Sequence, residues 1–558
     1  MARLLLGPIL RHVGERDATL WVETDMPCEV EVRAGSASGR ERTFTVAGHH
    51  FAMVILDGLE AASSTPYAVS LDGEAAWPPS DSTMPPSRIR TVDPDRQIRM
   101  LFGSCREATS VRGGNRKLDP DVLDAYAERM SGLDHEQWPD VLLLVGDQVY
   151  ADETTPEMQA FIRQRRDIRR EPKTQVADFE EYTQLYRESW SEPTVRWLLS
   201  TLPSSMIFDD HDVLDDWNTS HAWRVDMQAT DWWEERITGA LMSYWIYQHL
   251  GNLTPAGLAA NDMYRTVRDL PDGEAALRAF AQAADREADG AKGAMWSYRR
   301  DFGPVRLLVI DSRCGRVLAD DRRSMVSDPE FDWIERQAEE VGFRHLVIAT
   351  SMPWLLPRAL HDVESLNEAL CAGSRGAAIA RMSESLRRAL DLEHWAAFRK
   401  SFDRLARFFE RVGRGEHGGA APATICVLSG DVHHTYVSEA DYPKPLEARV
   451  FQVTSSPIHN TIPFVMRLVF HVGWSDTFQG VVRLLCRWAG VPPLPIHWHH
   501  PSGPHFGNTL ASLTFDGGSV KVRLERATWT EPSDGRETHP DIKIIEELSL
   551  MDLPRVIM

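Results

Sequence analysis

Short apolar runs separated by polar and turn-forming residues divide the sequence into two parts with different patterns. Residues 1 to about 95 contain stretches that alternate polar and apolar positions, such as Thr19–Glu23 and Tyr67–Leu71. A period of two that recurs between turn residues predicts a small β-sandwich. The segment from Trp77 to Gln97 is rich in Pro, Ser and Asp, and it is predicted to be a linker.

From Ile98 onward the apolar runs become continuous and alternate with stretches of helical periodicity. The runs are Met100–Phe102, Val141–Val145, Met206–Phe208, Val305–Ile310, Leu346–Ile348 and Ile425–Leu428. Helical periodicity lies between them, at residues 120–130, 179–199, 232–250 and 385–409. Buried strands that alternate with helices predict an α/β fold whose sheet is covered on both faces. Residues 510–524 predict a final β-hairpin.

These patterns predict three segments, namely a β-sandwich at 1–95, a large α/β domain at 96–535 and a C-terminal tail at 536–558. Within the second, the stretch from Ile462 to Leu494 is strongly apolar. Charged residues and glycines interrupt it, so a buried helical insertion is favoured over a lid that touches a membrane.

Composition restricts the possible partners and the compartment. The 558 residues carry a formal net charge of −21, which argues against nucleic acid as a partner because phosphate backbones require a basic surface. Six cysteines in so long a chain do not form a disulfide framework. We find neither a signal peptide nor a run long enough to span a bilayer, so the cytoplasm is the expected location. The oligomeric state is not indicated.

Five of the apolar runs end in residues that can bind a metal or transfer a proton. The residues that follow them are Gly103–Cys105, Gly146–Tyr150, Asp209–Asp212, Asp311–Arg313 and Ser429–His434. Because parallel strands place their carboxyl ends at one edge of a sheet, we expect these groups to converge. Asp431 and His433 should face one site and His434 another, because residues two apart on an extended segment point the same way.

The set of side chains suits two adjacent cations. A carboxylate on a strand-end loop can bridge two metals roughly 3.5–4 Å apart. Thiolate, phenolate and imidazole suit a transition metal, whereas carboxylates suit calcium, magnesium or manganese. A cysteine or histidine alone is more often structural, and only their convergence favours a site.

The order of these motifs resembles that of a known family. GSC at 103–105, GDQVYADE at 146–153, DDHD at 209–212, DSR at 311–313 and SGDVHHTY at 429–436 are similar to the PhoD-type alkaline phosphatases, a branch of the calcineurin-like metallophosphoesterases. The resemblance extends from about residue 5 to about residue 525. It implies an αββα metallophosphoesterase sandwich preceded by a small fibronectin III-like sandwich.

The resemblance also implies roles for individual residues. A first metal, Fe3+, would be bound by Cys105, Asp147, Tyr150 and His433. A second, Ca2+, would share Asp147 and be bound by Asp210 and Asp431, with Mn2+, Mg2+ or Zn2+ as alternatives. His211 would act at the leaving-group oxygen, and Arg313 would grip phosphate or form a structural salt bridge. Asp215 departs from the pattern, which has Asn there.

The implied reaction is hydrolysis of a small phosphomonoester or phosphodiester by a metal-activated hydroxide. A phospholipase-like diesterase on the same site is the alternative enzyme. A non-catalytic metal-binding recognition protein is the alternative from another class.

Overall fold

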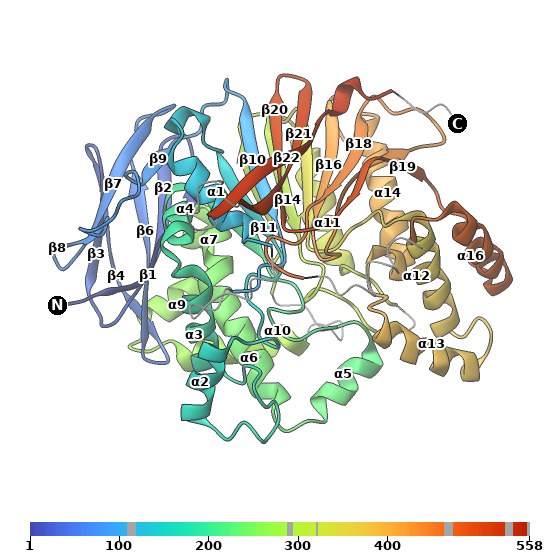
Figure 1. The fold of residues 1–558 in the computed structure, drawn as a ribbon, viewed down its shortest axis with the longest axis horizontal. Helices are drawn as coiled ribbons and strands as arrows, with labels where there is room; N and C mark the ends of the chain where they lie inside the picture. The colour runs from blue at the N-terminus through green and yellow to red at the C-terminus, as the bar shows by residue number, and fades with distance from the viewer. Residues whose placement is uncertain (109–118, 287–293, 320–321, 462–472, 531–538, 555–558) are drawn as a thin grey trace.

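The computed structural model describes residues 1–108, 119–286, 294–319, 322–461, 473–530 and 539–554. At its N-terminal end two small sheets pack face to face (Figure 1). One sheet has the order β1 (Leu4–Val13), β2 (Asp17–Thr24), β6 (His49–Asp57), β5 (Phe44–Val46). The other has the order β4 (Ala37–Arg42), β3 (Glu29–Ala34), β7 (Ser64–Leu71), β8 (Glu74–Trp77). Leu20, Val32 and Val54 are among the residues fully buried between them, so this is the predicted all-β sandwich.

The segment predicted to be a linker is partly a strand. β9 (Arg88–Arg90) pairs antiparallel with β7, and Ile89, opposite Thr65, is buried in the sandwich core. One apolar residue flanked by two arginines gives the alternating pattern of an edge strand, which the surrounding prolines obscure in the sequence.

Two larger sheets form the centre of the second domain (Figure 1). The first has the order β12 (Ser204–Ile207), β11 (Val141–Val145), β10 (Ile98–Gly103), β20 (Thr509–Asp516), β21 (Ser519–Thr530), β22 (His539–Ser549). The second has the order β13 (Tyr298–Phe302), β14 (Val305–Ile310), β15 (His345–Thr350), β16 (Thr424–Ser429), β18 (Arg449–Thr454), β17 (Thr435–Asp441), β19 (His497–His505). β22 lies in the segment assigned to a tail, and it pairs with β21 along its whole length.

Alternate residues of β14 show how the layers stack. Leu307 and Val309 belong to the core to which both sheets contribute. Leu308 and Ile310, on the opposite face, pack against helices α11 (Asp328–Glu339) and α14 (Arg399–Gly413). Helix α1 (Val122–Ser131) lies against β20, β21 and β22 of the other sheet. The layers are therefore helix, sheet, sheet, helix, which is the αββα arrangement expected.

The remaining helices connect the strands and surround their carboxyl ends (Figure 1). They are α2 (Pro156–Arg165), α3 (Phe179–Trp190), α4 (Pro193–Thr201), α5 (His221–Gln228), α6 (Trp233–Ser243), α7 (Leu250–Asn252), α8 (Pro255–Ala260), α9 (Asp262–Asp269), α10 (Glu274–Arg286), α12 (Arg358–Cys371), α13 (Ala377–Ala389) and α16 (Asp476–Ala489). Of the helices within the described residues, none has the length together with the apolar character that a bilayer crossing requires.

Two predicted helices are each divided in the structure. Residues 179–199 form α3 and α4, because Pro193 has no backbone N–H to donate and occupies the first turn of the second helix. Residues 385–409 contain the end of α13 and the start of α14. The chain leaves helical geometry between them, where Asp391 has a φ of 48°. That break carries Glu393 and His394 to the strand ends described next.

Candidate metal centre

Loops after strands of both sheets are joined to one another at the carboxyl edge. The backbone N–H of Arg106 donates to the carbonyl of Asp147 (3.0 Å), so the loops after β10 and β11 lie side by side. The N–H of Asp431, in the loop after β16, donates to the Ser104 hydroxyl (3.2 Å). The three loops therefore meet in one place.

Two glycines allow this close approach. A Cβ on Gly430 would lie 2.0 Å from the hydroxyl oxygen of Ser104. A Cβ on Gly146 would lie 2.8 Å from the Cβ atom of Asp209. The φ of Gly146 is +114°, a conformation that favours glycine. Any larger residue at either position would push the loops apart.

Four of the six expected ligand residues have left-handed backbone conformations. The φ values are 58° for Cys105, 48° for Asp147, 68° for Asp431 and 50° for His433. The segment after β16 is therefore not extended, and the alternation expected for Asp431, His433 and His434 does not apply. His434 packs against the ring of Tyr436, with centroids 5.1 Å apart.

Asp147, Asp209 and Asp210 place three carboxylates in contact. Each has an oxygen within 4.8 Å of an oxygen of the other two. None is more than 5% exposed. One oxygen of Asp147 and one of Asp209 have no hydrogen-bond partner among the described residues, and the Oδ1 atom of Asp210 lies 3.1 Å from the Arg313 guanidinium. Burial first, and then the nearby Cys105 and Asp209, raise the pKa of Asp147 well above its usual range. Clustered anionic oxygens that lack donors are stabilised by a bound cation.

A thiol and a phenol lie beside these carboxylates. The Cys105 sulfur is 3.2 Å from the Ser456 hydroxyl oxygen and 3.7 Å from the carbonyl oxygen of Asp431. Burial, followed by the charge of Asp431, raises the pKa of Cys105 to about 12. Tyr150 accepts a hydrogen bond from the Asn460 side chain (2.9 Å), and burial raises the pKa of its phenol well above 10. Both groups would be anionic ligands if a bound cation displaced their protons.

His433 completes this side of the cluster. Burial, followed by the charge of His211, lowers the pKa of His433 to about 4. The imidazole is therefore neutral at physiological pH, which is the form that binds a metal.

Asp431 is held by a histidine from the break between α13 and α14. The Nε2 atom of His394 lies 2.7 Å from an Asp431 oxygen, and its Nδ1 atom lies 2.6 Å from Glu364. Burial opposes the charge of Asp431, but His394 and Arg313 hold its pKa below its usual range. A carboxylate fixed through one oxygen keeps the other available to a ligand.

Asp212, the last residue of the DDHD motif, has a structural role. Its side chain accepts hydrogen bonds from the backbone N–H groups of Gln148 (3.0 Å), Val149 (3.1 Å) and Asp209 (2.9 Å). One carboxylate thus fixes the loop after β11 to the loop after β12.

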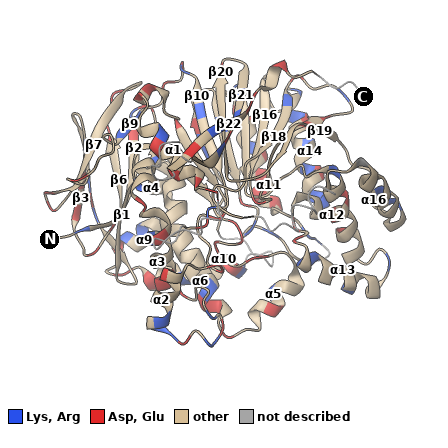
Figure 2. Cartoon of the chain, viewed as in Figure 1, with Lys and Arg blue, Asp and Glu red and all other residues tan. Residues whose placement is uncertain are grey.

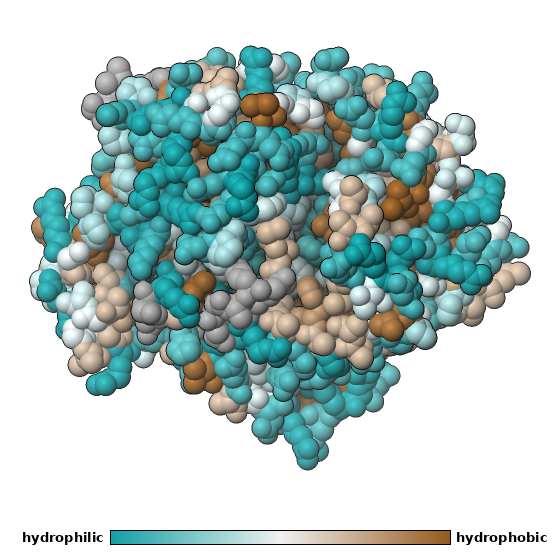
Figure 3. Space-filling model, turned by 180° about the vertical axis from the view of Figure 1, so that it is seen from behind, coloured by the Kyte–Doolittle hydropathy of each residue, from teal (hydrophilic) through white to brown (hydrophobic). Residues whose placement is uncertain are grey.

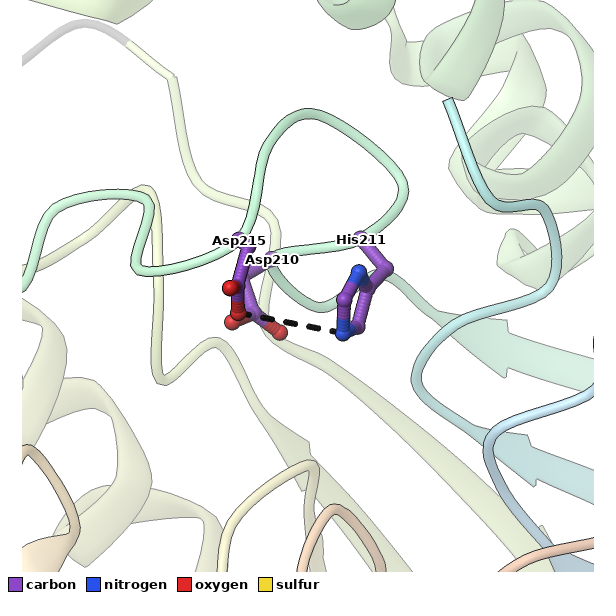
Figure 4. A group of neighbouring side chains, drawn as sticks. All are labelled: Asp210, His211 and Asp215. Atoms are coloured by element: carbon purple, nitrogen blue, oxygen red, sulfur yellow. Dashed lines mark ion pairs between the residues drawn. The ribbon is translucent and has the colours of Figure 1, made fainter. Parts of the chain in front are cut away.

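His211 is oriented by a carboxylate from the loop after β11. Its Nδ1 atom lies 3.0 Å from both oxygens of Asp152, and its ring stacks on Tyr150 with centroids 4.5 Å apart. Burial opposes protonation, but Asp152 and then Asp210 raise the pKa of His211 well above its usual value. The Nε2 atom lies 3.8 Å from Asp215, and Figure 4 shows Asp215 facing the same space as Asp210 and His211.

Arg313 is fully buried and surrounded by carboxylates. Its guanidinium pairs with Asp209, with Glu393 (2.5 Å) and with Asp210 (3.1 Å). Glu393 also binds Arg316 (3.0 Å). Of the two roles considered for Arg313, binding phosphate or forming a structural salt bridge, these contacts correspond to the salt bridge.

Comparison with known proteins identifies the family. Residues 122–469, more than half of the chain, match the PhoD-like phosphatase family. The chain belongs to the PhoD-like phosphatases. Residues 1–89 match a domain of unknown function, DUF7800. No curated protein matches the sequence.

Solved structures support the fold of this PhoD-like phosphatase. The structure of PhoD is similar with a TM-score of 0.57 at 12% identity, over 97% of this chain and 92% of that chain. The purple acid phosphatase PPD1 from yellow lupin (Lupinus luteus) seeds has a TM-score of 0.48 at 11% identity, over 96% of this chain and 73% of that chain. Because the TM-score of the second structure is as low as 0.48, we infer nothing from that similarity.

The contacts above bring together His211, Arg313 and five of the six expected ligands. His433, the sixth, is placed near them by the effect of the charges of His211 and Asp431 on its pKa. From the sequence alone, no role is assigned to five further members of the cluster, which are Asp152, Asp209, Glu393, His394 and Asn460. The first two lie within the motifs, so their proximity to Asp147 and His211 in the sequence is a usable signal. The other three lie at no strand end that the apolar runs reveal.

Proposed function

We propose that this PhoD-like phosphatase hydrolyses phosphomonoesters or phosphodiesters with a hydroxide activated at a binuclear metal centre. The observation that carries the proposal is the group formed by Asp147, Asp209 and Asp210. The three buried carboxylates each have an oxygen within 4.8 Å of the others. Arg313 pairs with Asp209, Asp210 and Glu393, so its single positive charge does not balance the group, and a bound cation would supply the remainder.

The donors divide into two sets around Asp147. One set combines thiol, phenol and imidazole and suits Fe3+ or another transition metal, whereas the other is made of carboxylates and suits Ca2+. Mn2+, Mg2+ or Zn2+ are alternatives for either position. When bound, two adjacent cations neutralise phosphate oxygens and lower the pKa of a water molecule so that hydroxide forms near neutral pH. The first set is Cys105, Asp147, Tyr150 and His433, and the second is Asp147, Asp210 and Asp431.

The role proposed for His211 is to donate a proton to the leaving-group oxygen. Asp152 fixes the Nδ1 side of the ring and Tyr150 supports its face, so the Nε2 atom is directed toward Asp215 and the cluster. A histidine whose charged form is stabilised by a buried carboxylate is suited to general-acid catalysis.

Arg313 is proposed to contribute by holding Asp209 and Asp210 in place, because its guanidinium is already paired with both. With Glu393 and Arg316 it forms a buried network of alternating charge. A fixed carboxylate loses less entropy on metal binding than a mobile one.

The test measures hydrolysis of nitrophenyl phosphate and bis-nitrophenyl phosphate together with the metal content of the purified protein. Asp147→Asn should lower turnover at least a thousandfold and reduce the bound metal. Asp269→Asn, at an exposed carboxylate at the end of α9, is the control and should change neither. If Asp147→Asn retains turnover, or if wild-type protein that turns over substrate contains no metal, the binuclear proposal is refuted.

A further inference from the structure

Two neighbouring helices carry much of the exposed apolar surface. Among the described residues, 16 large hydrophobic side chains are exposed, and seven of these lie in α13, its C-terminal cap residue and α16. They are 45–68% exposed, and they are Met382, Leu386, Leu390, Val481, Leu484, Leu485 and Trp488. Such clustering on a soluble surface marks an interaction site. We call this set, together with the loop at residues 372–376, the α13–α16 face.

The sequence of α16 explains why it exposes apolar residues. Val482, Cys486 and Ala489 are buried on one side, where the helix packs against α12. Leu484 and Trp488 point away from that contact and remain in solvent. The buried helical insertion predicted at Ile462–Leu494 is therefore helical at α16, but one apolar side of that helix is exposed. Residues 462–472 of the stretch lie outside the described residues.

The two helices flank α12, and a residue of the loop before α13 contacts α16. Both contact α12, and the guanidinium of Arg375, in the loop between α12 and α13, lies over the ring of Trp488 at 4.8 Å. Figure 1 shows α13 and α16 together at one end of the molecule. Figure 3, seen from the opposite side, shows tan and brown residues at its left edge, where these helices lie.

The charge of the α13–α16 face is opposite to that of the whole chain. Arg375, Arg381 and Arg487 are exposed, and none of them forms an ion pair with a described carboxylate. The chain as a whole has a net charge of −21, and Figure 2 shows acidic residues distributed over its other elements. At physiological salt the acidic remainder is screened beyond about 8 Å, so a partner at this face meets mainly positive charge.

We propose that the α13–α16 face docks on the surface of an anionic phospholipid bilayer. Exposed Leu, Val and Trp side chains flanked by arginines are the features of helices that lie in the membrane interface. A second copy of the chain fits less well, because a two-fold symmetric contact would bring together two surfaces of the same positive charge. This inference goes beyond the proposed function and does not depend on it.

The test is flotation of the full-length protein with vesicles, measured without any substrate. Vesicles of phosphatidylcholine containing about a third phosphatidylglycerol should bind the protein roughly a hundredfold more tightly than phosphatidylcholine alone, because each of three arginines contributes about fivefold. Binding to the anionic vesicles should weaken as salt is raised.

A matched pair of double variants separates docking from general effects. Leu484→Asp with Trp488→Ala should lower binding to anionic vesicles at least tenfold and leave turnover of nitrophenyl phosphate unchanged. Leu270→Asp with Trp529→Ala, at positions elsewhere that are 40% and 46% exposed, should leave binding unchanged.

Three results would overturn the proposal. One is a wild-type protein that does not float with anionic vesicles. Another is equal binding by wild type and the Leu484/Trp488 variant. The third is a wild-type dimer in sedimentation equilibrium that this variant converts to monomers, which would assign the face to self-association.

Discussion

Replacement of Asp152 by Asn removes the charge that faces His211 while preserving the size of the side chain. Asp152 is almost fully buried, and both of its oxygens lie 3.0 Å from the Nδ1 atom of His211. An Asn oxygen can still accept the hydrogen bond, and it can still accept one from the backbone N–H of Asp215 (2.7 Å). The variant therefore tests the charge and not the shape of the site.

The magnitude follows from the distance. Two unit charges 3.0 Å apart interact by about 5 kcal/mol at an effective dielectric constant of about 20. Desolvation and solvent relaxation offset part of this attraction, and we expect the pKa of His211 to fall when the charge of Asp152 is removed. Because Asp152 raises the pKa of His211 in the wild type, its removal causes the acid form to be lost at lower pH.

The assay compares good and poor leaving groups. With phenyl phosphate, whose leaving oxygen needs a proton, turnover near pH 8 should fall about a hundredfold. The alkaline limb of its pH profile should shift to lower pH. With dinitrophenyl phosphate, whose leaving group departs without protonation, the loss should be less than about fivefold. Asp17→Asn, which breaks a similar pair with His12 in the sandwich (2.9 Å), should change neither rate.

Two outcomes would refute the reasoning. An equal loss for both leaving groups would show that Asp152 does not act through proton donation. An unchanged alkaline limb would show that the limb does not report His211. Urea unfolding of the variant identifies a fold that is simply destabilised, since the midpoint would then fall together with both rates.

Further predictions concern stability and metal content. Burial opposes the charge of His49, but two carboxylates raise its pKa to about 9, so its stabilisation is complete below about pH 6.5 and lost as pH rises through about 9. In the wild type the free energy of unfolding should decrease between about pH 6 and about pH 10, and His49 should account for about 3 kcal/mol of that decrease. The decrease should therefore be about 3 kcal/mol smaller in His49→Gln. An equal decrease in both proteins would contradict this pKa. Gly430→Ala should destabilise the protein by about 1–3 kcal/mol in urea unfolding, whereas Gly480→Ala, with open space inside α16, should stabilise it by up to about 1 kcal/mol. Cys105→Ser should lose the transition metal by elemental analysis, and an unchanged content would exclude a thiolate ligand.

Among the described residues, the apolar runs and the final hairpin predict eight of the thirteen strands of the two larger sheets. They miss β13, β17, β18, β19 and β22, and β17 and β18 show that a buried strand can carry polar residues. Val141–Val145 and Val305–Ile310 coincide with β11 and β14. The same runs locate the residues immediately after these strands, and so they find Asp147 and Asp210. They do not find His394, because nothing in the local pattern at residues 391–395 shows that the helical stretch breaks there and returns to the site.

Other differences arise where tertiary contacts decide. Ile89 becomes part of β9 only because Thr65 of β7 offers its backbone for pairing. α16 has two apolar sides, and sequence alone does not show that α12 covers one of them only. The pattern of apolar residues shows which sides of a helix or strand could be buried, but it does not show which other helices and strands are present to cover them.

The left-handed backbone at Cys105, Asp147, Asp431 and His433 limits how the centre can change by mutation. Asp, Asn and His tolerate this conformation, whereas β-branched residues do not. Exchange between Asp and Asn at positions 147 and 431 would thus alter the charge offered to a cation and leave the backbone as it is. Mutant libraries that seek a different metal preference should be restricted to Asp, Asn and His at these positions. Most other substitutions would disturb the loop backbone and would not simply change the metal ligands.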